Sequence, residues 1–558
     1  MTFLPGGPWL LHALQQPALL ASLPEAQAVH PMSTRKPNIL FIMADQLRAD
    51  YLGCNGHPSI RTPNIDALAA RGVNFTRAYC QAPVCGPSRM SFYTGRYAIS
   101  HGASYNNVPL RVDERTIGDY LRPEGYRVAL VGKTHMRRDD EGMARLGIDP
   151  DSSRGVLVSE CGFEPFERDD GLHPDQSADP DLPYNRYLRS KGYAGPNPWH
   201  AHANSAQGEN GEVLSGWHMR HCHLPARVRE EDSETAYATN RAMDFIEEAG
   251  DTPWCLHLSY IKPHWPYMAP APYHAMYGRQ DILPAVRSEQ EREQPHPVLE
   301  AFMKHPESLE FSRVEVRERV IPAYMGLITQ LDDHVGRLMA FLEERGQLDN
   351  TLIVFTSDHG DYLGDHWLGE KELFHEPSAR IPMIVVDPSH QADATRSTTC
   401  ERLVEAIDLV PTFVDVAGGN SSDCDHVLEG RTLQPLLHGA TPTDWRTHAF
   451  SEADYAWRPA RKELGLAPDE ARAFMVTDGR WKYIHYEQHR PQLFDLREDP
   501  HELEDLAARA AYQEISRAME EALTNWSLER RTRVTVSNQR VAAATGSAHQ
   551  RGYLFGVW

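Results

Sequence analysis

The sequence predicts an α/β protein with a large, mostly parallel sheet covered by helices, followed by a smaller C-terminal α+β domain. The first observation is a series of short, continuous apolar runs, which are typical of strands buried on both faces. The second is helical periodicity between these runs, since strands that alternate with helices build parallel sheets. The third is a change after about residue 390: residues 472–486 alternate as antiparallel strands do, and residues 502–527 have helical spacing.

The strand-like runs occur at residues 38–44, 126–131, 254–258, 351–355 and 382–386. The clearest helix carries apolar residues spaced by three and four, namely Ile328, Leu331, Val335, Leu338 and Leu342. Gly346 follows this pattern and is a suitable C-terminal stop, because glycine readily adopts the left-handed conformation that ends many helices.

These patterns divide the chain into an N-terminal extension, a main α/β domain, a C-terminal domain and a tail. In that order, we assign these four parts to residues 1–35, 36–390, 391–525 and 526–558. Residues 139–232 are polar and weakly periodic, so we interpret them as a loop-rich insertion in the main domain. The tail ends in an aromatic segment, Tyr553–Trp558, which predicts docking on the same subunit or on a neighbour, and hence a homo-oligomer.

Composition excludes several classes of protein. The 558 residues include 56 Lys and Arg against 78 Asp and Glu, a net charge of −22, which argues against a nucleic-acid or anionic-membrane binder. No apolar run approaches the roughly 20 residues that a membrane-spanning helix needs. The eight cysteines are scattered and form no disulfide framework, so the predicted location is the cytoplasm. A periplasmic or secreted location is the alternative, although the apolar residues 9–23 lack a preceding basic residue.

Polar side chains follow four of the predicted strands directly. They are Asp45 and Gln46, then Lys133 and His135, then His264, and finally Asp358 and His359. Ligands of open α/β sheets bind beyond the carboxyl ends of the strands, where these residues would meet. The carboxylates, the amide and one imidazole could hold a divalent cation, and the lysines and other histidines could bind a small anionic substrate.

A further motif runs from Cys85 to Arg89, with the sequence Cys-Gly-Pro-Ser-Arg, and continues to Thr94-Gly95-Arg96. Pro87 and Ser88 suit the start of a helix. The dipole of such a helix would stabilise the thiolate form of a cysteine just before it. Together with the strand-end residues, this motif resembles the signature of the sulfatases of the alkaline phosphatase superfamily. The resemblance extends from about residue 36 to 510, and it implies an alkaline phosphatase-like fold.

The resemblance also implies the chemistry of the site. Cys85 would be oxidised to formylglycine by a formylglycine-generating enzyme, and its hydrate would attack the ester with one hydroxyl. The resemblance assigns metal binding to Asp45, Gln46, Cys85, Asp358 and His359. It assigns catalysis to Cys85, Arg89, Lys133, His135, His264 and Lys371, of which Lys133, His264 and Lys371 would also bind substrate. In this scheme, His264 or Lys371 protonates the leaving group and His135 deprotonates the second hydroxyl of the hydrate.

Two departures from the common sulfatase pattern leave the substrate open. The pairs Asp45-Gln46 and Asp358-His359 replace the usual Asp-Asp and Asp-Asn, and they resemble the phosphonate monoester hydrolase branch and its arylsulfatase relatives. Lys133 and His135 instead resemble ordinary sulfatases. We therefore expect an arylsulfatase-like sulfate monoesterase, with a phosphonate monoester or phosphodiester hydrolase as the alternative. A remote alternative is an unmodified, inert metal-binding protein. The expected metal is Mn²⁺ or Ca²⁺ rather than Mg²⁺, and the expected oligomer is a dimer or tetramer.

Overall fold

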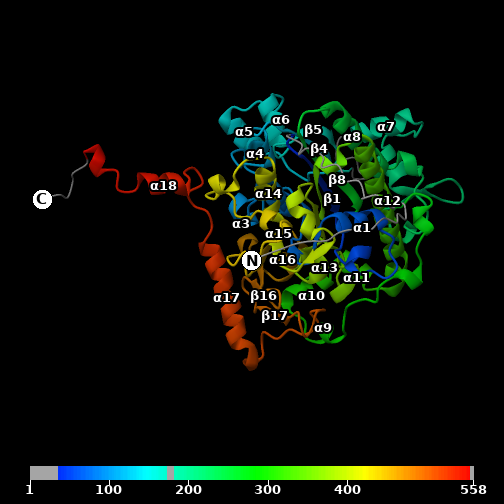
Figure 1. The fold of residues 1–558 in the computed structure, drawn as a ribbon. Coiled ribbons are helices and arrows are strands. Elements are labelled where there is room, and N and C mark those ends of the chain that lie inside the picture. Colours follow the sequence, from blue (N-terminus) through cyan, green and yellow to red (C-terminus); the bar gives the residue numbers. More distant parts are fainter. Residues whose placement is uncertain (1–34, 172–180, 553–558) are drawn as a thin grey trace, which may run out of the picture. The chain divides into compact units, whose positions relative to one another are not determined.

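The computed structural model describes residues 35–171 and 181–552. Its main feature is an eight-stranded sheet with the order β12-β2-β11-β9-β1-β8-β4-β5. Figure 1 labels β1, β8, β4 and β5 of this sheet. The strands are β1 (Asn38–Asp45), β2 (Val73–Phe75), β4 (Arg127–Gly132), β5 (Glu164–Arg168), β8 (Trp254–Pro263), β9 (Thr351–Ser357), β11 (Met383–Val386) and β12 (Thr398–Cys400). The five strands from β9 to β5 in this order are parallel, whereas β11 is antiparallel to both β9 and β2. The predicted large, mostly parallel sheet is confirmed.

Helices cover both faces of this sheet because successive side chains of a strand point to opposite sides. In β1, Ile39, Phe41 and Met43 face one core, to which α2 (Cys85–Thr94), α4 (Ile117–Leu121) and α14 (Leu409–Val416) contribute. The alternate residues of β1 face a second core. That core is built with α1 (Pro63–Arg71), α8 (Glu234–Ala249) and α12 (Val314–Glu344). With both faces buried, β1 shows the continuous apolar sequence from which it was predicted.

The helix predicted from Ile328 to Leu342 lies inside α12, and its five periodic side chains are all buried. The helix ends at Glu344, and Gly346 has a φ of 63°, in the left-handed region. The predicted stop at Gly346 is therefore confirmed.

A second, antiparallel sheet forms the core of the C-terminal part of the chain. Its strands, in order, are β14 (Ala449–Asp454), β15 (Arg472–Thr477), β16 (Trp481–Tyr486) and β17 (Gln492–Asp495), and α17 (Gln513–Leu528) packs on it. The predicted strands within 472–486 are confirmed, but the predicted start of the helix at residue 502 is wrong. Glu502 has a φ of 55°, and the N–H of Leu506 donates to the carbonyl of Leu493, so this segment follows β17 instead of forming a helical turn.

The insertion at residues 139–232 has more regular structure than the predicted loops. It contains α5 (Asp140–Leu146), α6 (Ser153–Ser159), α7 (Pro183–Ser190) and the hairpin strands β6 (Ser205–Gln207) and β7 (Val213–Ser215). It also contains β5, which pairs with β4 at the edge of the main sheet. The sequence hid this strand because an edge strand tolerates charged residues, here Glu164, Glu167 and Arg168.

The remaining elements are short. A small three-stranded sheet contains β3 (Ala78–Tyr79), β10 (Arg380–Ile381) and β13 (Val404–Glu405). The other helices are α3 (Ala98–His101), α9 (Gln290–Glu293), α10 (Pro297–Met303), α11 (Pro306–Phe311), α13 (Glu376–Ala379), α15 (Gln434–Leu437), α16 (Pro459–Glu463) and α18 (Asn538–Ala544). In the described residues of the tail, α18 has no buried side chain. Residues 1–34 of the predicted extension and the aromatic segment 553–558 lie outside the described residues.

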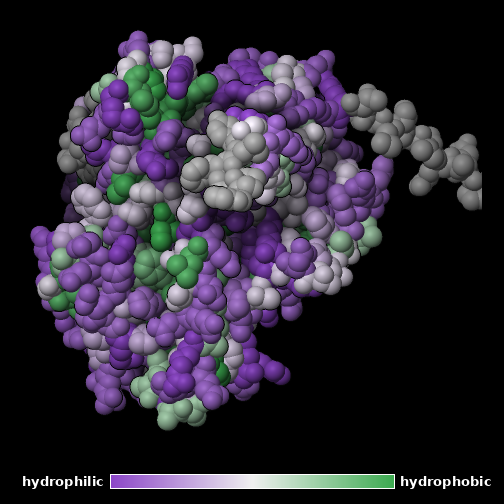
Figure 2. Space-filling model, turned by 90° about the vertical axis from the view of Figure 1, so that its left-hand side faces the viewer, coloured by the Kyte–Doolittle hydropathy of each residue, from purple (hydrophilic) through white to green (hydrophobic). Residues whose placement is uncertain are grey.

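On the face drawn in Figure 2, hydrophilic residues cover most of the surface, and hydrophobic residues form small, separate groups. Single exposed apolar residues are normal on a folded protein, and the coloured part of this face has no broad apolar patch. Among the helices of the described ranges, none has the length and apolarity that crossing a membrane requires.

Candidate active site

The carboxyl ends of four parallel strands meet at one edge of the main sheet. Asp45 is the last residue of β1 and lies opposite Pro263 of β8, while Ala44 lies opposite Ser357, the last residue of β9. Asp358 and His359 follow β9, His264 follows β8, and Lys133 and His135 follow β4. The sheet topology thus brings the predicted strand-end residues to a single site.

A buried cluster at this edge has the donor atoms of a metal site. One ligand atom each from Asp45, Cys85, Asp358 and His359 lies within 4.8 Å of the others, and all four residues are buried. The His359 Nδ1 lies 2.9 Å from the Gly360 carbonyl, and its Nε2 lies 3.1 Å from the Cys85 Sγ. Two carboxylates and an imidazole suit a divalent cation. This donor set fits a divalent metal ion, as predicted, without selecting between Mn²⁺ and Ca²⁺.

Gln46, the fifth predicted ligand, lies beside the cluster. Its backbone N–H donates to the Asp358 carboxylate at 3.0 Å. Its side-chain oxygen accepts a hydrogen bond from the Lys371 ammonium at 2.7 Å, and its side-chain nitrogen donates to Asp361 at 2.5 Å. Gln46 therefore connects Asp358, through its backbone N–H, to Lys371, through its side-chain oxygen.

Arg89 fixes the two carboxylates of the cluster. Its guanidinium donates to Asp358 at 2.9 Å and to Asp45 at 3.0 Å, and both ion pairs are fully buried. It also donates to the carbonyl of Lys133 and to the hydroxyl of Ser259. A planar guanidinium with several donors is well suited to hold two carboxylates at once. Arg89 is thus a positioning residue that orients ligands from β1 and β9.

Cys85 is the first residue of α2, and cationic groups surround its thiol. The ammonium of Lys371 lies 3.4 Å from the Cys85 Sγ, and that of Lys133 lies 3.9 Å away. Burial raises the pKa of the Cys85 thiol, but Lys133, Lys371 and His359 outweigh it and bring this pKa well below its usual value. The position therefore favours a negatively charged group, as the start of a helix also does.

A cavity of about 310 Å³ opens above Cys85. Lys133, His135, His264 and Lys371 line it, so the structure brings the predicted substrate-binding and proton-transfer residues to the cavity that contains Cys85. The His264 Nδ1 lies 2.7 Å from the carbonyl of Trp265, and burial lowers the pKa of His264 to about 3. Arg89 lies beneath the cavity, where it contacts the metal cluster instead of the lining.

Two acidic residues of the site were missed among the candidates. Asp361 accepts hydrogen bonds from Gln46 and from the hydroxyl of Tyr267 at 2.8 Å. Asp170 accepts the backbone N–H groups of Thr134 and His135 at 2.8 and 3.0 Å, and so holds the segment that carries His135. Asp361 stands two residues after His359, a proximity that could have identified it. No comparable signal marks Asp170, because it follows the edge strand β5 that the sequence concealed.

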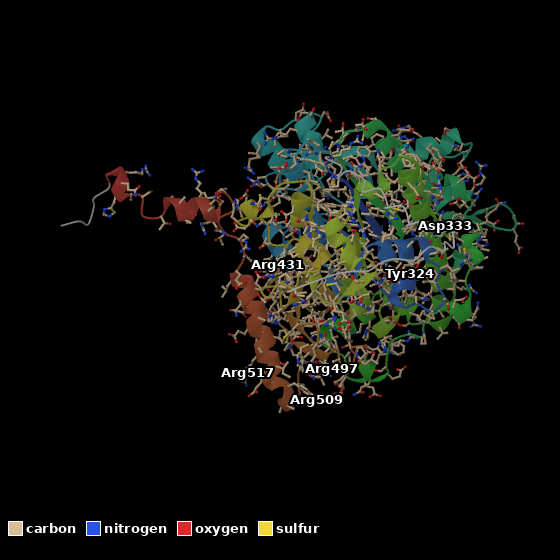
Figure 3. All side chains as sticks on the ribbon, in the orientation of Figure 1. Tyr324, Asp333, Arg431, Arg497, Arg509 and Arg517 are labelled. Carbon is tan, nitrogen blue, oxygen red and sulfur yellow. The ribbon has the colours of Figure 1, made fainter. Side chains whose placement is uncertain are left out.

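Tyr324 of α12, labelled in Figure 3, forms hydrogen bonds with the backbone that follows β1. Its hydroxyl donates to the carbonyl of Gln46 at 2.8 Å and accepts the N–H of Arg48 at 3.0 Å. Gln46 needs this support because its φ of 64° is unusual for a residue other than glycine.

Comparisons with known proteins agree with this geometry. The Sulfatase family model matches residues 37–419, and a model described as N-sulphoglucosamine sulphohydrolase, C-terminal, matches residues 364–529. The chain belongs to the Sulfatase family. It is 32% identical to a multifunctional alkaline phosphatase superfamily protein of Trinickia caryophylli, over 89% of this chain and 96% of the relative. It is also 28% identical to an arylsulfatase of Clostridium perfringens, over 86% and 92%.

Two solved phosphonate monoester hydrolases have the same fold. The enzyme of Agrobacterium radiobacter has a TM-score of 0.75 and 29% identity, covering 88% of this chain and 96% of its own. The enzyme of Silicibacter pomeroyi has a TM-score of 0.77 and 29% identity, covering 89% and 97%. The predicted resemblance, including its proximity to the phosphonate monoester hydrolase branch, is confirmed. The family is metal-dependent and uses formylglycine, and the candidate metal site of this chain includes Cys85.

Proposed function

We propose that this protein hydrolyses sulfate monoesters with a formylglycine derived from Cys85. The observation that carries the proposal is the environment of the Cys85 side chain. Its sulfur lies beside two lysine ammonium groups, within a four-residue cluster suited to a divalent cation, at the base of a cavity. A sulfate ester and an anionic nucleophile repel each other, and this concentration of positive charge offsets that repulsion.

Each residue around the cavity has a separate role in the proposed reaction. A divalent cation would polarise the ester oxygens, and the hydrated formylglycine would provide a hydroxyl nucleophile. Lys133 and Lys371 attract the ester anion and hold it above residue 85. His264 or Lys371 protonates the leaving oxygen. The Lys371 ammonium already carries a proton, whereas burial lowers the pKa of His264 to about 3, so His264 would take up a proton only beside the bound anion. Asp170 fixes the backbone of His135, which takes a proton when the product is released.

Hydrolysis of phosphonate monoesters is the second candidate, and a specific observation favours it. Gln46 and His359 replace the carboxylate and amide that are common in sulfatases, which makes the site less anionic and gives it a nitrogen donor. The two phosphonate monoester hydrolases cited above share the fold over most of the chain. The oxygen and nitrogen donors together support Mn²⁺ as the metal, with Ca²⁺ next.

The testing experiment compares kcat/KM for 4-nitrophenyl sulfate and for a 4-nitrophenyl phosphonate monoester. One preparation, co-expressed with a formylglycine-generating enzyme and loaded with Mn²⁺, serves for both substrates. A ratio above one for sulfate supports the main proposal, and a ratio below one assigns the protein to phosphonate ester hydrolysis. Absence of turnover with both esters, in protein whose Cys85 is shown to be converted, would leave the inert metal-binding alternative.

The proposal includes two protein partners. A formylglycine-generating enzyme must act on the segment from Cys85 to Arg89 before folding, because every residue of α2 is buried in the folded chain.

A second copy of the chain is the other partner, and the exposed Leu528 and Val541 are apolar side chains that such an interface would cover. Sedimentation of the full chain and of a chain ending at residue 530 tests this: an oligomer that survives the truncation contradicts a role for the tail.

A further inference from the structure

The lining of the catalytic cavity is aromatic as well as charged. Trp199 and Trp217 come from the insertion and Trp265 from the turn after β8, and all three line the cavity. The rings of Trp217 and Trp265 lie 5.1 Å apart with an angle of 62° between their planes. Edge-to-face aromatic pairs stabilise each other and present large apolar areas. The cavity therefore combines a floor that binds anions with walls that favour an apolar group.

A second aromatic surface leads from the cavity to the outside. Tyr105 lines the cavity, and its ring is nearly parallel to that of Trp457, with centroids 6.4 Å apart and an interplanar angle of 10°. Trp457 is 63% exposed, and its neighbour Arg458 also lines the cavity. An exposed tryptophan is ordinarily unremarkable, but this one extends an aromatic surface that begins inside the active site. We call Tyr105 and Trp457 the outer aromatic surface.

One carboxylate connects both rings to the catalytic residues. The Tyr105 hydroxyl donates to Glu372 at 2.7 Å, and Arg458 forms an ion pair with the same carboxylate at 2.8 Å. Glu372 directly follows Lys371, whose ammonium lies 3.4 Å from the Cys85 sulfur. The outer aromatic surface is thus held at a defined position relative to the reacting group, and its polar neighbours already pair with each other.

We propose that the outer aromatic surface binds the distal ring of a planar aromatic leaving group, so that the preferred substrates are esters of fused or linked two-ring phenols. This inference rests on the proposed function, because the ester must be held above residue 85. In this arrangement the first ring contacts the tryptophans of the cavity, and the second stacks along Tyr105 and Trp457. A sugar ring fits less well, since its hydroxyl groups would compete with the ion pair between Glu372 and Arg458.

The experiment measures kcat/KM for 4-methylumbelliferyl sulfate, which has two fused rings, and for 4-nitrophenyl sulfate, which has one. The enzymes are the wild type, Trp457→Ala and Trp457→Phe, in the full-length, modified protein. Stacking of aromatic rings contributes about 0.5–1.5 kcal/mol beyond burial of area, and every 1.4 kcal/mol is tenfold. We expect Trp457→Ala to lower the ratio of two-ring to one-ring kcat/KM about two- to twelvefold, mainly through KM, and Trp457→Phe to restore most of it. Leu309→Ala, which removes another exposed apolar side chain, is the control.

An unchanged ratio in Trp457→Ala overturns the inference, as does a selective loss of activity toward a sulfated sugar such as glucosamine 6-sulfate. Failure of the proposed function is recognised separately, because the wild type would then hydrolyse neither aryl sulfate. In that event, tryptophan fluorescence measures how tightly each intact ester binds to the protein whose Cys85 is unconverted. Tighter binding of the two-ring ester that disappears in Trp457→Ala supports the outer surface, and equal binding overturns it.

Discussion

Arg89 offers a quantitative test of how the four residues of the candidate metal site are stabilised. Its fully buried guanidinium neutralises Asp45 and Asp358, which lie 3.0 and 2.9 Å away. Replacing it in Arg89→Met keeps an unbranched side chain, but the buried Asp358 loses its arginine, and Asp45 keeps the Lys133 ammonium at 2.6 Å as its cationic neighbour. Breaking a buried ion pair in this way costs about 3–5 kcal/mol. With an unfolding entropy of about 2.1 cal/mol/K per residue, a unit of roughly 500 residues loses about 1 °C in Tm for each kcal/mol.

We therefore expect the metal-free Arg89→Met protein to unfold about 3–5 °C below the metal-free wild type in a calorimetric scan. A divalent cation bound by the same carboxylates replaces part of the lost positive charge, so saturating Mn²⁺ should reduce this difference. Arg96→Met is the matched control, because it breaks the buried ion pair with Glu114 at 2.6 Å outside the metal cluster. The reasoning is refuted if Mn²⁺ rescues both variants equally, or if metal-free Arg89→Met is as stable as the wild type.

The remaining predictions concern conversion, orientation, metal and pH. Peptide mass spectrometry should find the Cys85 peptide lighter by the difference between H₂S and an oxygen atom; an unchanged mass supports the inert alternative. Asp170→Ala should lower kcat/KM for 4-nitrophenyl sulfate about ten- to hundredfold, because two N–H groups lose their acceptor; the exposed Asp151→Ala should not. Removal of metal with EDTA should abolish activity and Mn²⁺ should restore it; activity that persists in verified metal-free protein contradicts the site. Burial raises the pKa of Glu452 to about 8. The folded state thus holds this proton more tightly than the unfolded state, and stability is lost as pH rises from about 4.5 to 8. The Tm of Glu452→Gln relative to the wild type should therefore increase between pH 5 and pH 9; a constant difference would show that Glu452 does not titrate in this range.

Much of the site could be predicted because its residues stand next to elements with strong sequence patterns. Asp45 ends a continuous apolar strand, and Asp358 and His359 begin directly after another. Parallel strands buried on both faces place their carboxyl ends at one edge, so the sequence pattern implied that these side chains meet. Cys85 was identified by its local motif, which also begins a helix.

Other features depended on contacts that no local pattern encodes. The strand β5 lies at a sheet edge with charged residues, and its continuation places Asp170 against His135. The helix α17 begins at Gln513 because the preceding segment pairs with β17 instead of coiling. In both cases a tertiary contact overrides the local pattern, since backbone hydrogen-bonding groups can be satisfied equally well by a distant partner.

The sequence by itself therefore determined the fold class, the family and the charged residues that surround Cys85, because buried strands and the motif that begins at Cys85 leave local patterns. Only the tertiary structure decided which residues line the cavity around Cys85 and which aromatic rings lie beside it. Tyr105 and Trp457 are more than 300 positions apart, yet their rings are nearly parallel beside the cavity. Such a pair is formed by the packing of the C-terminal part against the main domain, and packing depends on the shape of the whole fold.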